Sequence, residues 1–178
     1  MNSINQNQPE HNRENLRGNA AIERIQQVVK QAPTCFFCTS MATGESAGAR
    51  PMNVRKADDQ GILWFLSASD SHTNQELAMD GAVRLFFQGS QHTDFLHLHG
   101  NATVSTDRVK IEELWEPILS TWFTGGIDDP RITVIRVEPT HGYYWATKNG
   151  ATIAFLKIML GAMLGQTLDD SIEGKLNV

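Results

Sequence analysis

Apolar side chains recur along this chain with two different periods, which together predict a mainly β fold with a few helices. Residues 82–88 (AVRLFFQ) alternate between apolar and polar side chains, as a half-buried strand does. Residues 20–31 instead repeat their apolar positions with the spacing of an amphipathic helix. The buried face of this helix is predicted to consist of Ala21, Ile25, Val28 and Val29.

The same patterns divide the rest of the chain into short elements. Strands are predicted at residues 34–42, 50–56, 62–67, 82–88, 94–104, 131–138 and 142–147. Helices are predicted at residues 73–79, 107–115 and 116–123, with an apolar helix at 151–165. Gly100 is expected to mark a β-bulge in the longest of these strands, and Pro139 is expected to separate the last two.

This order of elements favours a small barrel with peripheral helices over a doubly wound sheet. The first three predicted strands have no helix between them, whereas parallel strands need a long crossover connection. Residues 1–18 are polar and lack apolar periodicity, so they are expected to form a flexible tail. The domain is predicted to cover residues 19–150, followed by a C-terminal helix and tail at 151–178.

Composition narrows the classes of function. The net charge of −5 argues against a nucleic-acid-binding face as the default. The longest apolar run is interrupted by Lys157 and is too short to span a bilayer, and residues 1–18 contain no apolar signal segment. Two cysteines among 178 residues fit a reducing cytoplasm better than a disulfide scaffold. We therefore expect a cytoplasmic protein that binds neither nucleic acid nor membrane.

Three short motifs suggest chemistry that their context does not support. Residues 44–48 match the G-x-S-x-G nucleophile elbow, but a strand rather than a helix is predicted to follow them. Cys35 and Cys38 form a C-x-x-C on a predicted strand, where positions three apart point to opposite faces. His97 and His99 share one strand face and are the best metal candidates, yet spacing places no further ligand beside them. No metal site is predicted.

One constellation points to a phosphorylated small molecule. Arg50 and Arg55 lie on one predicted strand, and Ser67 and Ser71 lie where another strand runs into a predicted helix start. Guanidinium groups, hydroxyls and the free N–H groups of a helix start suit a phosphate monoester. The two arginines are five positions apart and face opposite ways on an ideal strand, so Arg50 is the stronger candidate. Trp122, beside a glycine-rich loop, is the aromatic residue expected to contact a ligand.

Several motifs together resemble the FMN-binding split barrels related to pyridoxamine 5′-phosphate oxidase, and in particular the bacterial general stress protein group. They are residues 50–55 (RPMNVR), 63–67 (LWFLS), 71–77 (SHTNQEL), 100–102 (GNA), 110–115 (KIEELW), 122–130 (WFTGGIDDP), 136–139 (RVEP) and 144–145 (YW). The resemblance covers residues 20–150 and rests on the order and spacing of these motifs.

The resemblance implies a six-stranded split β-barrel that forms a homodimer with an FMN at the subunit interface. By position, Arg50, Ser67, Ser71, His72 and Thr73 would surround the FMN phosphate. The flavin ring would lie along Met52, Asn53, Arg55 and Leu66, with part of its wall supplied by the second subunit. That part of the wall is expected to include Phe95 and His97.

Two departures from the family pattern affect the expected activity. The family often has a lysine where this chain has Thr73, so one phosphate partner is missing, and a protonated His72 would replace it only in part. The oxidase's Arg/His-rich substrate motif is also absent after Trp145, which argues against true pyridoxamine phosphate oxidation.

The resemblance therefore implies an FMN-dependent oxidoreductase that acts on a small-molecule substrate or NAD(P)H. No side chain stands out as a general acid or base, so no catalytic residue is assigned. The alternative is a non-catalytic stress-response module that stores flavin or haem, and His97 and His99 motivate the haem version.

Overall fold

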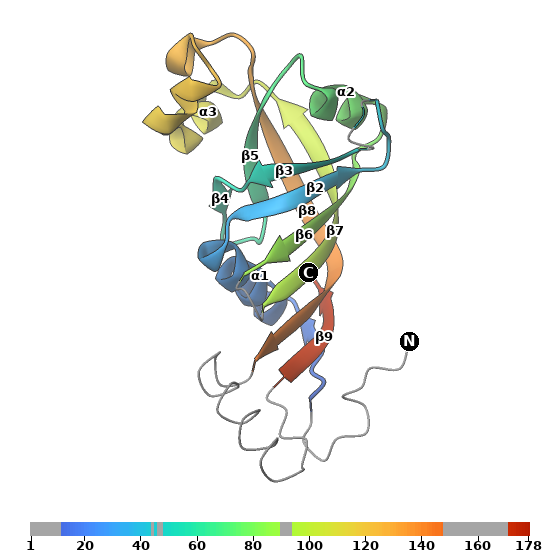
Figure 1. The fold of residues 1–178 in the computed structure, drawn as a ribbon. Helices are drawn as coiled ribbons and strands as arrows, with labels where there is room; N and C mark the ends of the chain where they lie inside the picture. Colours follow the sequence, from blue (N-terminus) through green and yellow to red (C-terminus); the bar gives the residue numbers. More distant parts are fainter. Residues whose placement is uncertain (1–11, 44, 46–47, 90–93, 148–170) are drawn as a thin grey trace, which may run out of the picture.

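The computed structural model describes residues 12–43, 45, 48–89, 94–147 and 171–178. Their strands form one mixed sheet that curls into a barrel, with helices at its two ends (Figure 1). The main order is β1-β9-β8-β7-β6-β2-β3, and β5 adds to β8 while β4 adds to β5. The strands are β1 (Leu16–Arg17), β2 (Thr34–Thr39), β3 (Ala49–Asn53), β4 (Lys56–Ala57), β5 (Leu63–Ala68), β6 (Ala82–Gln88), β7 (Phe95–Ser105), β8 (Ile132–Thr147) and β9 (Ser171–Asn177). The mainly β fold class is confirmed.

The barrel is split because β8 is long enough to pair with two separate groups of strands. It runs for 16 residues and pairs with β7 along one edge. On its other edge, the first half of β8 pairs with β5 and the second half pairs with β9. The edge of β8 therefore changes partner along its length.

The prediction that Pro139 separates two strands was wrong. The pairing register of β7 and β8 shifts between His99 and Gly100, and Pro139 lies opposite Gly100 at this irregularity. A bulge disrupts the hydrogen-bond ladder locally, so a residue without an N–H group is tolerated there. The bulge predicted at Gly100 is thus confirmed, and it explains why the strand continues through the proline.

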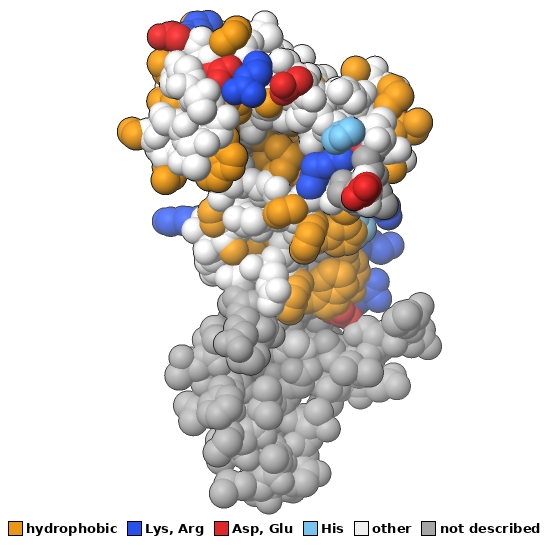
Figure 2. All heavy atoms as spheres, turned by 45° about the horizontal axis from the view of Figure 1, so that its top comes forward, with side chains coloured by type: hydrophobic (Ala, Val, Ile, Leu, Met, Phe, Trp, Pro, Cys, Tyr) orange, Lys and Arg blue, Asp and Glu red, His pale blue; other side chains and the backbone are white. Residues whose placement is uncertain are grey.

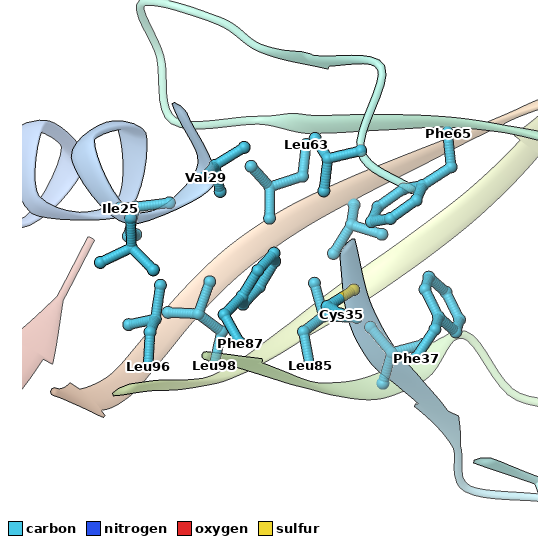
Figure 3. Packing of buried hydrophobic residues seen from close by; sticks show 14 of the residues in the cluster. Ile25, Val29, Cys35, Phe37, Leu63, Phe65, Leu85, Phe87, Leu96 and Leu98 are labelled. Carbon is cyan, nitrogen blue, oxygen red and sulfur yellow. The ribbon is translucent and has the colours of Figure 1, made fainter. Parts of the chain in front are cut away.

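Helix α1 (Asn19–Gln31) covers one open end of the barrel. Its buried residues are Ala21, Ile25, Val28 and Val29, as its periodicity predicted. Ile25 and Val29 point into the core toward Leu63 and the inward residues of β6 and β7 (Figure 3). Farther along the barrel, Phe37 and Phe65 meet edge to face with their ring centroids 5.3 Å apart. Burial of this apolar face is what fixes α1 against the strands.

A second, smaller core forms around helix α3 (Arg108–Leu114) and the 3₁₀ segments η2 (Pro117–Thr121) and η3 (Gly126–Asp128). Asp107 caps α3 by accepting a hydrogen bond from the Lys110 N–H group. The cluster packs onto the start of β8 and consists of Ile111, Leu114, Leu119, Phe123, Ile132 and Val134. This core holds the 117–128 segment at a defined position beside β5.

Residues near both ends of the chain form strands that the sequence did not predict. β1 pairs in parallel with β9, so residues 16–17 do not belong to a structureless tail. The Tyr144 hydroxyl also donates a hydrogen bond to the Glu14 carbonyl at 2.9 Å. Both strands are short or polar, and their partner is distant in sequence, so periodicity gave no signal. The helix predicted at 151–165 lies outside the described residues.

One further boundary differs from prediction. The strand predicted at residues 50–56 is divided into β3 and β4, because the Val54 N–H group donates to Pro33 and the Arg55 N–H group donates to Trp64.

Gly48 has a φ of 74° and leads directly into β3, so no helix follows the G-x-S-x-G sequence, as the hairpin interpretation requires. Within the described residues, no helix is long and apolar enough to cross a bilayer.

Gly174 provides a test of the β1–β9 contact. A Cβ atom at this position would overlap the Glu14 carbonyl oxygen, so Gly174→Val should push residues 12–17 off β9. We expect the free energy of unfolding, measured in urea, to fall by about 2 kcal/mol. Lys175→Thr on the exposed side of the same strand is the matched control and should have little effect. Equal stability of Gly174→Val and the native protein would show that the N-terminal contact contributes nothing.

Candidate functional site

A hollow of about 680 Å³ lies between the barrel and the η2 segment, within the size range of small-molecule sites. Strands β2 and β3, the Arg55 turn and β5 form one side, and η2 with the two residues after it forms the other. In Figure 2 a recess with apolar side chains at its base separates the two upper lobes. The hollow is lined by Thr34, Pro51, Met52, Asn53, Arg55, Leu66, Ser67, Ala68, Ile118, Leu119, Trp122 and Phe123.

The structure brings half of the predicted cofactor residues into this single hollow. They are Met52, Asn53, Arg55, Leu66, Ser67 and Trp122. Most of the lining is apolar, and its polar atoms come from Thr34, Asn53, Arg55 and Ser67. Such a surface suits a flat, mostly apolar ligand with a few polar edge atoms.

Trp122 and Ile118 form the outer wall of the hollow because of how η2 packs. Leu119 and Phe123 turn into the small core around α3, which leaves the side chains before each of them on the opposite side. Trp122 is 65% exposed and Ile118 is 61% exposed. Large apolar side chains held this far out of the core form a ready contact surface for a ligand.

Arg55 links the barrel side of the hollow to the η2 side. One of its terminal nitrogens lies 2.6 Å from the Glu116 carboxylate, and the other donates to the Asn53 side-chain oxygen at 3.1 Å. Its Nε atom is buried and has no hydrogen-bond partner in the described part of the chain. An unpaired buried donor costs free energy, so a ligand acceptor that reaches it would gain a favourable contact.

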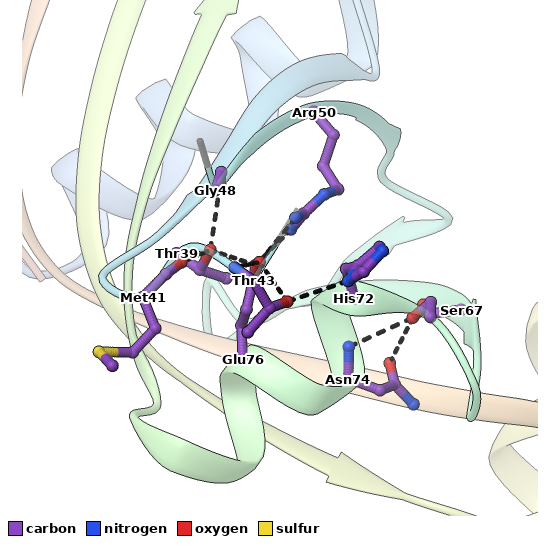
Figure 4. A network of polar contacts seen from close by, with 10 residues as sticks. Thr39, Met41, Thr43, Gly48, Arg50, Ser67, His72, Asn74 and Glu76 are labelled. Carbon is purple, nitrogen blue, oxygen red and sulfur yellow. Dashed lines mark hydrogen bonds and ion pairs between the residues drawn. The ribbon is translucent and has the colours of Figure 1, made fainter. Parts of the chain in front are cut away.

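A second polar group lies beside the hollow, where β2, β3 and helix α2 (His72–Met79) meet (Figure 4). At its centre is Glu76, whose side chain is fully buried. Both terminal nitrogens of Arg50 donate to this carboxylate, at 2.6 and 2.9 Å. The hydroxyls of Thr39 and Thr43 donate to it at 2.6 and 2.9 Å, and so does the Thr43 N–H group, at 2.8 Å. These donors compensate the burial of a charge.

These contacts keep Glu76 ionised. The Arg50 guanidinium is the main cause and holds the pKa of this carboxyl far below its usual range, while burial acts in the opposite direction. The pair is therefore a neutral unit, and Arg50 is not a free cation waiting for a ligand. Its guanidinium still has N–H groups that Glu76 does not use, because a bidentate pair engages only two of its five.

The structure separates the two arginines that the sequence placed on one strand. Arg50 pairs with Glu76 on α2, whereas Arg55 pairs with Glu116 at the start of η2. The break between β3 and β4 turns the chain between them. The two guanidinium groups are thus directed to different carboxylates and not to one shared position.

The start of α2 connects the hollow with the Glu76 group. Ser71 caps the helix by accepting from the Asn74 N–H group, and its hydroxyl lies 3.0 Å from that of Ser67. Thr133 anchors this turn, since it accepts from the Asn74 side chain at 2.8 Å and donates to the Ser67 carbonyl at 2.9 Å. The first-turn N–H groups of α2 are thus held next to a residue that lines the hollow.

His72 and Thr73 begin α2 but differ in environment. His72 is exposed, and its Nδ1 atom lies 3.0 Å from the Thr43 hydroxyl, which also bonds to Glu76. Thr73 is buried at 3% exposure and does not line the hollow. His72 is therefore the more accessible of the two side chains.

Phe95 and His97 lie on the outer face of β7 and do not line this hollow. The rings of His97 and Phe86 stack with their centroids 4.4 Å apart. The expectation that a second subunit presents these residues to a flavin stays a prediction.

Sequence reasoning missed the two carboxylates that define the site, Glu76 and Glu116. The buried face of α2 carries Thr73, Asn74, Glu76 and Leu77, and this unusually polar inward face was the available signal. A charged residue on a buried helix face requires a partner of opposite charge nearby. For Glu116 no comparable signal exists, because its side chain is 61% exposed.

The two cysteines are free, as the strand geometry predicted. Cys35 is buried and Cys38 half-buried, and burial is the main cause that raises the pKa of the Cys35 thiol to about 12. In the described ranges, no three side chains of the His, Cys, Asp or Glu type are arranged to hold a metal ion.

Replacing Glu76 by glutamine tests whether this ion pair holds the site together. We expect the free energy of unfolding near neutral pH to fall by about 3 kcal/mol, because Arg50 loses its buried partner. The carboxyl pKa is depressed in the folded protein, so the stabilisation is present above its ordinary pKa of 4.5 and is lost as pH falls below it. The gap between native protein and variant should therefore narrow in acid.

Urea unfolding across this pH range is the measurement. Asp80→Asn is the control, because Asp80 bonds to Ser40 at the exposed end of α2 and its loss should change stability little. A Glu76→Gln protein as stable as the native one at neutral pH would contradict the proposed importance of the pair.

Comparisons with known proteins agree with this architecture. Residues 20–169 match the family model described as "Pyridoxamine 5'-phosphate oxidase like". The Neurospora crassa protein bli-3 is 31% identical over 111 residues, a stretch that covers 57% of this chain and 53% of that protein. The chain therefore spans about half the length of this relative.

Two solved structures show the same fold. A protein assigned as general stress protein 26 from Jannaschia sp. is 20% identical with a TM-score of 0.71, over 89% of this chain and 95% of that one. The general stress FMN/FAD binding protein from Xanthomonas citri is 24% identical with a TM-score of 0.62, over 72% and 93%. Because the family model spans well over half of its length, the chain belongs to the pyridoxamine 5′-phosphate oxidase-like family.

Proposed function

We propose that this protein binds FMN, with the flavin ring in the hollow and the phosphate at the start of α2. The observation that carries the proposal is the contact between the Ser67 and Ser71 hydroxyls, which joins the hollow to a helix N-terminus. A phosphate monoester at a helix start meets unpaired N–H groups and the positive end of the helix dipole. The Xanthomonas citri relative, named for FMN or FAD binding, supports a flavin as the ligand.

The hollow fits the flavin ring in both shape and chemistry. Met52 and Leu66 offer apolar contact from the barrel side, and Trp122 offers an aromatic face from the η2 side. The buried Nε–H group of Arg55 lacks a partner and would suit an acceptor on the polar edge of the ring. Asn53, which accepts from Arg55, would contact the same edge.

The phosphate end is expected to bind with moderate strength. Ser67 and Ser71 supply hydroxyls, Arg50 supplies the N–H groups that Glu76 leaves free, and His72 is exposed beside them. Glu76 cancels the charge of Arg50, and Thr73 stands where the family often has lysine. The start of α2 would therefore carry more of the attraction.

When bound, a flavin supplies the electron-transfer chemistry. The residues of this chain position it, keep water from one face of the ring and set the polarity of its edge. Arg55 is the one titratable side chain among the residues lining the hollow, and Glu116 pairs with it. This favours an oxidoreductase that moves electrons directly between flavin and substrate, without a side-chain acid or base.

A homodimer is part of the proposal. The outer face of β2, β6, β7 and β8 exposes several aromatic side chains, among them Phe36, Phe86, Phe95 and Trp145. A second copy that covers this face would bring Phe95 and His97 toward the flavin of its partner.

Two free cysteines fit the reducing cytoplasm as the place of action.

Titration of flavin-free protein with FMN and with riboflavin tests the phosphate assignment. The native protein should bind FMN about tenfold or more tightly than riboflavin, because only FMN carries the phosphate. Arg50→Ala should lose most of this preference, because it leaves the Glu76 carboxylate uncompensated beside the phosphate, and the exposed Arg17→Ala should keep it. The ratio of the two affinities is informative even if the variant is less stable. Equal binding of both flavins by the native protein would refute the assignment.

A reduction experiment separates the oxidoreductase from a non-catalytic flavin store. The absence of an acid or base among the lining residues is the observation that keeps the storage function open. We expect NADH or NADPH to bleach the visible absorbance of the bound flavin under anaerobic conditions. A reduction rate no faster than that of free FMN would instead support storage. A Soret band on adding haem, lost in His97→Ala, would support the haem version.

A further inference from the structure

Four aromatic rings from three neighbouring strands form a continuous stack on the outer face of the barrel. Phe86 on β6 lies parallel to His97 on β7, with ring centroids 4.4 Å apart and an interplanar angle of 4°. His97 and His99 follow at 4.5 Å and 54°. His99 then stacks on His141 of β8 at 4.4 Å and 6°. Three of the four rings can take up a proton, and we call this set the histidine ladder.

Strand register builds the ladder. Phe86 is the direct cross-strand partner of His97, and His99 is the direct partner of His141. His97 and His99 are two positions apart, so they share a face of β7. The rings are thus held together by the backbone pairing and do not depend on chance side-chain rotamers.

The surroundings of His97 and His99 disfavour the charged imidazole. The Nε2 atom of His97 is buried and lacks a partner within the described ranges. Burial is the largest cause that lowers the pKa of both His97 and His99 from 6.5, and their histidine neighbours and Arg84 lower it further.

The charges that act on the ladder are all cationic. Arg84 lies opposite His99, and Lys175 lies opposite Tyr143, which is itself the partner of His97. The carboxylates on the surrounding elements have other partners: Glu138 pairs with Arg136, Asp80 bonds to Ser40, and Glu173 interacts with Tyr143. The remaining titratable group on this face is the Cys38 thiol, opposite Arg84. The direct register partner of His99 is therefore a cation, and its charge opposes protonation of the ladder.

The same face is the most exposed aromatic surface of the barrel. Phe36 is 59% exposed, Trp145 43%, Phe86 40% and Phe95 38%. Figure 2 shows apolar side chains gathered there, with basic side chains along one edge. The solvent-exposed area of these four side chains is on the order of 350 Å². This approaches half of the ~800 Å² that each partner buries in a stable interface. A second copy, meeting this face with its own identical aromatic face, would cover it.

We propose that the histidine ladder is a proton-sensitive seam, through which two copies of this chain associate while the imidazoles are neutral and separate when they protonate. The inference rests on the homodimer of the proposed function and adds its regulation. Association buries the ladder further, which disfavours the charged form still more. Each copy brings its own ladder, so protonation would place like charges on both sides of the seam.

The direction of the pH effect follows from linkage. Because the dimer binds protons less readily than the monomer, its dissociation constant is constant above the histidine pKa values and rises as pH falls below them. If each protomer takes up one proton on dissociation, the dissociation constant rises about a hundredfold for each pH unit below the histidine pKa values. The dimer is thus expected near neutral pH and should weaken in mild acid.

Sedimentation velocity of the flavin-free full chain, at about pH 7.5 and about pH 5.5, tests the proposal across the range in which histidine titrates. The native protein should be a dimer at the higher pH, with a dissociation constant at least about tenfold larger at the lower pH. The triple variant His97→Phe, His99→Phe, His141→Phe keeps the aromatic rings but cannot protonate in the ladder, so it should remain dimeric at both. His72→Phe, outside the ladder, is the control and should behave like the native protein. Circular dichroism at both pH values confirms that each variant is folded.

The possible outcomes are distinct. A native dimer of equal strength at both pH values would overturn the ladder as a switch while leaving the dimer intact. Dissociation of the triple variant in parallel with the native protein would also overturn it. A native protein that is monomeric at the higher pH would remove the homodimer and the switch together, but would leave flavin binding by the hollow untouched.

Discussion

The buried carboxylate of Glu76 is the constraint on which the geometry of the site depends. A fully buried charge must collect donors, and Glu76 collects them from Thr39 at the end of β2, from the following loop at Thr43, and from β3 at Arg50. These contacts hold α2 in place, and with it the Ser71 cap beside Ser67 in the hollow. The arrangement has a chemical consequence: the charge of Arg50 is already neutralised, so the proposed recognition of a phosphate would rely on backbone N–H groups and hydroxyls as well. The site thus combines a rigid frame with charge-balanced ion pairs.

Much of the fold was predictable because apolar periodicity is a local signal. The buried face of α1, the extent of β6 and the caps of α2 and α3 follow from residues close together in sequence. The errors arose where a distant partner decides the structure. Pro139 continues a strand because β7 bulges opposite it, whereas β9 forms along β8 and β1 forms along β9. No pattern within residues 12–18 or 171–178 alone specifies those pairings.

The candidate site was predictable to a similar degree. The resemblance of residues 50–55 and 63–73 to a known family identified side chains that the structure gathers in one hollow, including Met52, Leu66 and Ser67. It did not reveal their partners. Whether Arg50 faces a ligand or a carboxylate depends on the packing of α2 against β2 and β3, and whether Arg55 is paired depends on where η2 places Glu116. Whether an arginine is neutralised by a nearby carboxylate depends on the folded arrangement. A sequence motif that contains only the arginines does not show it.

The position of β9 between β8 and β1 constrains the order in which the molecule assembles during synthesis. Residues 12–17 leave the ribosome early, but the strand against which they lie, residues 171–177, is the last of the described strands to be made. The first segment must therefore wait, without these hydrogen-bond partners, until residues 171–177 have emerged. The central strands from β2 to β8 have no such dependence and can collapse around α1 beforehand. Closure of this end of the barrel is accordingly a late, long-range step, whose rate is expected to be set by loop-closure entropy more than by local propensity.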